Sequence, residues 1–213
     1  TEAGSAAGDA AWTYLAYGPF ASEAALRGFV AGFATTHDPM AWAIRPQAGG
    51  TATTTRSPSP AARVFASPGP IYEPEGSAAD YWRMAPALRA AGIQAGDLVH
   101  NAFSYHMTPG AFIMESGAHA VGCTVFPAGV GQTEQQLQAI AELRPAAYSG
   151  TPSFLRILLE KAAEANADVR CLRKGLVGGE AFPPSLRDWF LERGLAVYQS
   201  YATADLGLIA YET

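Results

Sequence analysis

The sequence predicts an α/β fold with a mostly parallel sheet and helices on both faces. From residue 97 onward, short apolar strands alternate with helical segments of about ten to fifteen residues, the pattern of β-α-β units. Two of the helical segments open on a Thr-Pro pair, which is typical of a helix N-terminus. The apolar share of the chain, 49%, is enough for a packed core.

The first elements follow from apolar spacing and from helix stop signals. Residues 78–91 predict a helix that ends at Gly92, and Pro86 is expected to kink or shorten it. Residues 97–101 predict a strand. The pair Thr108-Pro109 then predicts a helix, with the threonine as N-cap and the proline in the first helical position.

The second half of the chain repeats this alternation. Residues 123–126 predict an apolar strand that is closed by Pro127. Residues 133–143 predict a helix whose start fits a capping box, with Gln136 reaching back to Thr133. The remaining predicted elements are a strand at 146–149, a helix from Thr151-Pro152, a strand at 175–177, a helix at 184–192 and a last strand at 196–199.

Two segments of different composition precede this unit. Residues 47–62 are rich in Gly, Thr, Ser and Pro and predict a linker. Residues 1–46 are predicted to form a small N-terminal α+β extension, with Ser22 as the N-cap of a helix and 40–44 as a short strand. The unit that carries the chemistry is therefore expected at 63–213.

The bulk composition excludes several classes of protein. The net charge is −5 and the basic residues are scattered, which argues against a nucleic-acid partner. The two cysteines, Cys123 and Cys171, lack the spacing of a zinc site, so reduced thiols are expected. No apolar run reaches the roughly 18 residues of a membrane span, and no signal peptide is recognisable. A cytoplasmic chain without a membrane partner is therefore expected.

The loops that follow the predicted strands are the expected ligand site, because the carboxyl ends of parallel strands meet at one edge of a sheet. In Gly178-Gly179-Glu180, the glycines allow a planar ligand to approach the backbone, and the carboxylate can accept from a base or ribose. Tyr201 can stack on a base, and Thr203 and Asp205 can reach a phosphate and its Mg²⁺. A plain β-to-α turn and a capped helix start are the structural alternatives.

The order of several sequence blocks resembles the phenylacetate–CoA ligase branch of the AMP-forming ligases over about residues 63–213. These blocks are HNAFSYH, TVFPAGVGQTEQQL, YSGTPS, LVGGEAF and VYQSYATAD. The resemblance implies part of an adenylate-forming N-terminal domain and a two-step reaction that uses ATP and CoA. A carboxylate attacks the α-phosphate of ATP to give an acyl-adenylate, and the CoA thiol then displaces AMP.

The same resemblance implies roles for particular residues. Gly179 and Glu180 match the family's turn at the adenine, and Tyr201 matches the tyrosine that packs on the adenine ring. Asp205 stands where the family has its Mg²⁺-binding glutamate. The residues implied at the acyl pocket and on the loop beside it are Phe103, Tyr105, His106, Gly150, Thr151 and Pro152. An aromatic wall suits an aryl acid such as phenylacetate. Core packing is the alternative role for Phe103 and Tyr105.

The phosphate loop of the family, SSGTTGKP, corresponds to residues 67–74, which read SPGPIYEP. Ser67 and Gly69 remain and are assigned to the nucleotide site. The two family threonines are replaced by Pro and Ile, and the lysine is replaced by Glu73. A carboxylate beside the triphosphate is repulsive, on the order of 1 kcal/mol at about 4 Å in water. Weakened ATP binding is therefore expected.

The family's hinge and its C-terminal domain with the catalytic lysine have no counterpart before Thr213, so no catalytic residue is assigned and little turnover is expected from this truncated unit. A non-catalytic module that binds an adenylate or acyl group is the alternative function. An uncovered sheet edge also favours self-association into a homodimer. Residues 12–46 resemble the start of GNAT-type acetyltransferases but lack their pyrophosphate loop, so no acetyltransferase activity is expected.

Overall fold

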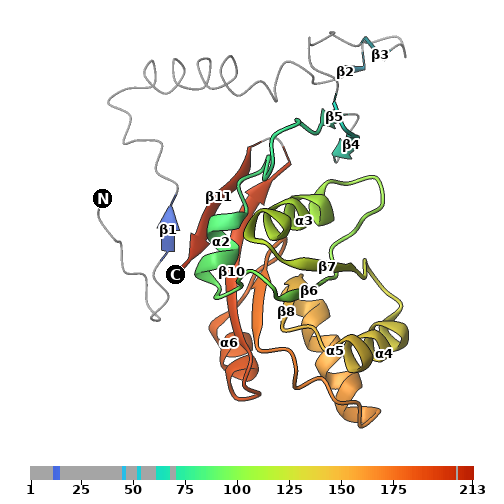
Figure 1. Ribbon diagram of the computed structural model, residues 1–213, viewed down its shortest axis with the longest axis vertical. Coiled ribbons are helices and arrows are strands. Elements are labelled where there is room, and N and C mark those ends of the chain that lie inside the picture. Colours follow the sequence, from blue (N-terminus) through green and yellow to red (C-terminus); the bar gives the residue numbers. More distant parts are fainter. Residues whose placement is uncertain (1–11, 15–44, 47–51, 54–60, 68–70, 205) are drawn as a thin grey trace.

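The computed structural model describes residues 12–14, 45–46, 52–53, 61–67, 71–204 and 206–213 (Figure 1). Its centre is a seven-stranded sheet in the order β1-β11-β10-β9-β8-β6-β7. The strands are β1 (Trp12–Tyr14), β6 (Leu98–Asn101), β7 (Thr124–Pro127), β8 (Ala147–Gly150), β9 (Lys174–Val177), β10 (Ala196–Thr203) and β11 (Gly207–Glu212). From β7 to β10 every neighbouring pair is parallel, whereas β11 pairs antiparallel with both β10 and β1. The predicted, mostly parallel sheet is confirmed.

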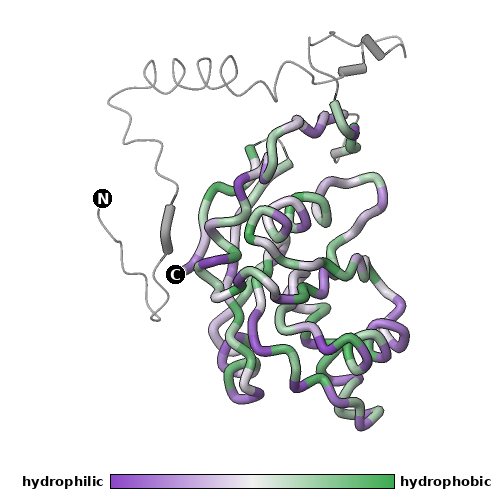
Figure 2. The backbone as a smooth tube through the Cα atoms, viewed as in Figure 1, coloured by the Kyte–Doolittle hydropathy of each residue, from purple (hydrophilic) through white to green (hydrophobic). Residues whose placement is uncertain are grey.

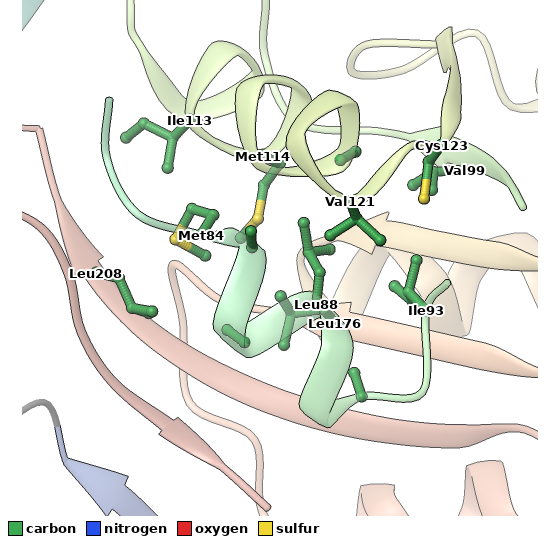
Figure 3. Packing of buried hydrophobic residues seen from close by; sticks show 14 of the residues in the cluster. Met84, Leu88, Ile93, Val99, Ile113, Met114, Val121, Cys123, Leu176 and Leu208 are labelled. Atoms are coloured by element: carbon green, nitrogen blue, oxygen red, sulfur yellow. The ribbon is translucent and has the colours of Figure 1, made fainter. Parts of the chain in front are cut away.

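Helices cover both faces of this sheet, as predicted. They are α2 (Ala85–Ala90), α3 (Gly110–Val121), α4 (Thr133–Leu143), α5 (Pro152–Glu164) and α6 (Pro184–Leu191). On one face, α2 and α3 pack on Val99 and Leu176 in a first core cluster (Figure 3). On the other face, α4, α5 and α6 pack on Tyr148 and Val197 in a second core cluster. Successive side chains of a strand point to opposite faces, so β8, β9 and β10 each contribute to both clusters.

The hydropathy of the helices fits their position on the sheet. Along α4, α5 and α6, hydrophobic and hydrophilic residues alternate over short distances (Figure 2). Such alternation is expected of helices with one face on a core and one in water. Among the described residues, no helix combines the length and the apolar character that crossing a membrane requires.

The last strand of the sheet was predicted only in part. β10 extends beyond the predicted 196–199, so Tyr201 and Thr203 lie within a strand and not in a loop. The chain then turns and returns as β11, a strand that was not predicted. The pairing of β10 with β11 shifts register between Tyr201 and Ala202, which is typical of a β-bulge.

The predicted start of the first helix is wrong. The helix α2 begins at Ala85, and the segment before it is a series of turns. The Asp80 carboxylate accepts hydrogen bonds from the backbone amides of Met84 (2.7 Å) and Ala85 (2.9 Å), which satisfies the first helical N–H groups. Pro86 therefore lies in the first turn, where a proline is tolerated, and marks the shortening that was predicted.

Three of the predicted helix caps lie within the described residues, and only one of these is confirmed. Thr151 is the N-cap of α5, and its Oγ1 accepts from the backbone N–H of Phe154 at 3.4 Å. Thr108 is not a cap, because Pro109 occupies the N-cap position of α3. The capping box at Thr133 is also wrong, because Gln132 precedes α4 as N-cap and the side chain of Gln136 is buried elsewhere.

Two short ribbons lie outside the main sheet. β4 (Val64–Ser67) pairs antiparallel with β5 (Ile71–Pro74), and β2 (Arg45–Pro46) pairs with β3 (Ala52–Thr53). Phe65 of β4 belongs to the first core cluster, so the β4–β5 ribbon is attached to the sheet domain. The predicted helix after Ser22 and the predicted strand at 40–44 lie outside the described residues. The division into 1–46, 47–62 and 63–213 stays a prediction.

Candidate functional site

The carboxyl ends of β6, β8 and β9 lie side by side at one edge of the sheet, and β10 continues past them. The parallel register pairs Asn101 with Ser149, Gly150 with Val177, and Val177 with Gln199. The loops that follow β6, β8 and β9 therefore meet beside the part of β10 that extends beyond its parallel pairing. This is the edge at which ligands bind in open parallel sheets.

The two glycines after β9 bring three of these loops into contact. Gly179 has a left-handed φ of +81°, and a Cβ built there would lie 3.7 Å from Phe103 and 3.9 Å from Thr151. A Cβ at Gly178 would lie 3.0 Å from the carbonyl oxygen of Ser200, the residue before Tyr201. The turn predicted at the adenine thus lies against β10 on one side and against the predicted acyl residues on the other.

The carboxylate of Glu180 is bound to the start of α5. Its Oε1 accepts from the backbone N–H of Ser153 at 2.6 Å, a favourable position for a negative charge because it faces the helix N-terminus. Its carbonyl oxygen accepts from the Gln199 side chain at 3.0 Å. Burial, and then the charge of Glu180, raise the pKa of the Tyr148 phenol, which therefore stays neutral. Glu180 thus links the glycine turn to β10 and to the N-terminal turn of α5.

Tyr201 and Thr203, in the last part of β10, differ in their exposure and their hydrogen bonds. The Tyr201 side chain is 57% exposed, so it is outside the core and accessible to a ligand. The Thr203 Oγ1 accepts from the backbone N–H of Leu206 at 3.2 Å, so it also stabilises the turn before β11. Asp205 and Gly69 lie outside the described residues, as does the side chain of Ser67. Within the described part of the chain, no three His, Cys, Asp or Glu side chains form a cluster suited to a metal ion.

Trp82 anchors the turn that joins β10 to β11. Its Nε1 donates to the carbonyl of Ala204 at 2.9 Å, and its own carbonyl accepts from the N–H of Leu208 at 2.9 Å. Gly207 has a φ of +70° and passes so close to Trp82 that a Cβ would lie 2.5 Å from its carbonyl oxygen. The position of Thr203 thus depends on Trp82, which lies 122 residues before Ala204 in the sequence.

The predicted acyl residues after β6 occupy different environments. The Tyr105 hydroxyl donates to Glu115 Oε2 at 2.6 Å and accepts from Asn101 Nδ2 at 2.9 Å. Burial, and then the contact with Glu115, raise the pKa of this phenol, so it is neutral. Phe103 is half-buried against the first core cluster, whereas the His106 side chain is exposed. Phe103 therefore contributes to core packing, whereas Tyr105 packs edge-on against the ring of Phe112.

The residues on the loop after β8 support the start of α5. A Cβ at Gly150 would lie 2.2 Å from the Tyr148 hydroxyl, which donates to the Thr151 carbonyl at 3.2 Å. Pro152 is buried as the first residue of α5. Of these loop residues, Thr151 approaches Gly179 and so adjoins the turn that was predicted at the nucleotide.

The β4–β5 ribbon, which contains described residues of the predicted phosphate loop, adjoins the loop after β6. The backbone N–H of Ala66, in β4, donates to the carbonyl of Met107 at 2.9 Å. At the base of the ribbon, Arg63 pairs with Glu75 at 2.5 Å and lies 4.6 Å from the centre of the Phe112 ring. The β4–β5 ribbon is thus held beside the predicted acyl residues.

Two site features were not predicted from the sequence. The hydroxyls of Ser149, near the carboxyl end of β8, and of Ser200, within β10, are buried, and neither has a hydrogen-bond partner among the described residues. Buried hydroxyls normally have partners, so such groups at a strand end are compatible with a ligand-binding site. Their only signal in the sequence was a serine at the end of an apolar strand.

Comparison with known proteins gives concordant matches. The sequence profile described as "AMP-binding enzyme" matches residues 104–213. Phenylacetate-coenzyme A ligase of Aromatoleum evansii is 35% identical over 112 residues, which cover 51% of this chain and 26% of that protein. The corresponding ligase of Pseudomonas putida is 32% identical over 126 residues, covering 58% and 29%. The chain thus spans less than a third of the length of these curated relatives.

Solved structures of related fold include CoA ligases. An open conformation of 2-hydroxyisobutyryl-CoA ligase, in complex with 2-HIB-AMP and CoA, superposes with a TM-score of 0.64 and 27% identity, covering 72% of this chain and 38% of that chain. CmiS6 superposes with a TM-score of 0.53 and 19% identity, covering 74% of this chain and 41% of that chain, a likeness of fold alone.

Proposed function

Since the chain belongs to the family of AMP-binding enzymes and is related within it to phenylacetate–CoA ligases, we propose that it forms the adenylate- and acyl-binding part of an acyl–CoA ligase. The proposed substrate is an aryl carboxylate such as phenylacetate. ATP would activate it to an acyl-adenylate, and CoA would receive the acyl group. Asp205 is proposed as a Mg²⁺ ligand on the resemblance to the family alone.

The observation that carries this proposal is the contact between the glycine turn and β10. Gly178 packs on the carbonyl of Ser200, and the next residue is Tyr201, whose ring is exposed. A purine can stack on this ring, while the glycine turn lets the ligand approach the backbone closely. The residues present therefore fit the adenosine part of AMP.

The acyl part would bind beside the same turn. Phe103 approaches Gly179, so an aromatic wall begins next to the proposed adenine position. Tyr105 is neutral, so it brings no charge to a pocket for an aryl ring. In this arrangement the carboxylate of an aryl acid points toward the nucleotide, as the formation of an acyl-adenylate requires.

Replacing Tyr201 tests the proposal. The Tyr201→Ala variant is expected to bind AMP and phenylacetyl-AMP roughly 5- to 150-fold more weakly, because base stacking contributes about 1–3 kcal/mol. The Tyr201→Phe variant keeps the ring and is the matched control, with an expected affinity near that of the original chain. Isothermal titration of the 213-residue chain measures both. Equal affinities of the alanine variant and the original chain would contradict the stacking role, and flat heats for both ligands would reject the site.

A second function is favoured by the altered phosphate loop. Glu73 replaces the family's lysine, and prolines at positions 68 and 70 remove backbone donors. These changes support a non-catalytic module that binds an adenylate or acyl group without activating it. A pyrophosphate-release assay separates the two functions, using the protein expressed from the complete reading frame and a panel of aryl acids. Turnover would exclude the second function, whereas AMP binding without turnover would favour it.

A further inference from the structure

A histidine is enclosed in the core below the loop that follows β7. His100 lies in β6, and its side chain is 0% exposed. Its ring is stacked between Phe126 and Tyr148, with centroid distances of 5.5 Å and 6.3 Å. Its Nε2 lies 2.7 Å from the Oε1 of Gln136, a buried residue of α4.

The hydrogen bonds of Gln136 fix the tautomer of this histidine. The Gln136 Nε2 lies 2.9 Å from the carbonyl oxygen of Gly129 and 2.6 Å from that of Gly131, and it donates to both. Because carbonyl oxygens only accept, the amide nitrogen must face the loop and the amide oxygen must face His100. The Nε2 of His100 therefore carries the hydrogen. Its Nδ1 is an unprotonated buried nitrogen with no hydrogen bond within the described residues.

The loop held by Gln136 borders the proposed acyl pocket. The N–H of Gly129 donates to the carbonyl of Asn101 at 3.0 Å, and a Cβ at Gly129 would lie 4.0 Å from the Tyr105 ring. Gly129 and Gly131 both have a left-handed φ, +70° and +72°. A chain of contacts thus leads from His100 through Gln136 and Gly129 to Tyr105.

We propose that His100 and Gln136 are positioning residues that hold the Gly129–Gly131 loop against Tyr105 and so fix one wall of the acyl pocket. Neither residue needs to touch a substrate. Neutral His100 donates to Gln136 and orients its amide, and Gln136 in turn donates to the two loop carbonyls. The acyl-pocket part of this inference rests on the proposed function, whereas the clamp on the loop does not.

The surroundings of His100 favour the neutral ring. The side chains described as stacking on it or bonding to it are those of Phe126, Tyr148 and Gln136, and none of these three carries a negative charge. Burial lowers the pKa of His100 from the ordinary value of 6.5, and the hydrogen bond with Gln136 offsets this only in part. Because the folded-state pKa is the lower one, the unfolded chain takes up the proton first as the pH falls. The stability that neutral His100 contributes is therefore complete above pH 6.5 and declines below it.

Backbone hydrogen exchange tests the clamp in the complete 213-residue chain. The Gln136→Met variant is expected to exchange the amides of 128–131 about tenfold faster or more, with α4 and β6 still protected. Gln138→Met, on the exposed side of the same helix, is the matched control and is expected to leave exchange unchanged.

His100→Phe, which keeps the stacking but removes the donor, is expected to act like Gln136→Met. His100→Gln, which restores an N–H donor, is expected to return most of the protection. Unchanged loop exchange in Gln136→Met would overturn the clamp.

Two further readouts separate positioning from a general loss of stability. In the original chain at about pH 8, the imidazole ¹⁵N spectrum of His100 is expected to show the Nε2–H tautomer. An Nδ1–H tautomer would overturn the pair, even if the variants failed to fold. Gln136→Met is also expected to weaken phenylacetyl-AMP at least about threefold while leaving AMP affinity unchanged. Equal weakening of the affinities for both ligands would overturn the acyl-wall role.

If the original chain binds neither ligand, the proposed function and the acyl-wall role both fail. In that case, hydrogen exchange of the 128–131 amides alone tests the clamp.

Discussion

The Arg187→Leu variant is expected to lose about 3–5 kcal/mol of unfolding free energy, because the change leaves a buried carboxylate without its cation. Arg187 donates to both oxygens of Glu212, at 2.6 and 2.7 Å, and the Glu212 side chain is only 3% exposed. Arg187 also donates to the carbonyl of Val197 at 2.8 Å, and Glu212 accepts from the N–H of Gln199 at 2.8 Å. The pair therefore joins α6 to β10 and β11.

Urea unfolding followed by circular dichroism measures this loss. The control is Arg156→Leu, because Arg156 forms an ion pair with Glu160 at the surface, where the two side chains are 53% and 44% exposed. Its expected cost is at most about 0.5 kcal/mol. Removing both charges in Arg187→Leu/Glu212→Leu is expected to recover part of the loss, since no unpaired charge remains buried. Equal midpoints for the Arg187 and Arg156 variants would contradict the structural role of the pair.

The Gly207→Ala variant is expected to lose about 2–5 kcal/mol. A left-handed φ costs a residue with a side chain about 1–2 kcal/mol, and overpacking adds about 1–3 kcal/mol. Both terms apply here, because Gly207 has a φ of +70° and its Cβ would lie 2.5 Å from the backbone oxygen of Trp82. Backbone atoms cannot move aside as a flexible side chain can, so the turn before β11 would have to shift.

Gly92→Ala separates the backbone cost from the overpacking cost. Gly92 has a φ of +77°, but no atom lies within 4 Å of the position that a Cβ would take there. This control is expected to lose only the backbone term of about 1–2 kcal/mol. Thermal and urea unfolding of both variants give the comparison. If Gly207→Ala costs no more than Gly92→Ala, the close contact with Trp82 does not constrain the turn.

The sequence was most informative where structure depends on local spacing. The alternation of apolar strands and helices predicted the parallel sheet, and this in turn selected the loops at the carboxyl ends of the strands. Thr151 was recognised as a cap from a hydroxyl residue followed by proline, although the same pair at Thr108-Pro109 does not cap α3. The placement of Gly179 beside Phe103 and Thr151 follows from the topology of the sheet, and not from any single motif.

The sequence was least informative where distant residues decide the structure. β11 is recognisable only from its pairing with β10 and β1, since its short apolar run follows a turn without a characteristic strand pattern. Gln136 has the spacing of a capping box, but its side chain bonds His100, which lies 36 residues earlier. The Asp80 carboxylate accepts hydrogen bonds from the backbone amides at the start of α2. The apolar periodicity had predicted that this turn was part of the helix.

The nucleotide site at the carboxyl edge of the sheet is tested most directly by titrating the ¹⁵N-labelled chain with AMP and following the backbone amides by NMR. The expected result is a saturable set of shifts centred on 178–180 and 199–203, and their loss in Tyr201→Ala. The opposite edge of the sheet has a surface pocket lined in part by Asn166, Val169 and Arg193, and it serves as an internal control. Shifts confined to that pocket, or no shifts near the glycine turn at millimolar AMP, would contradict the account.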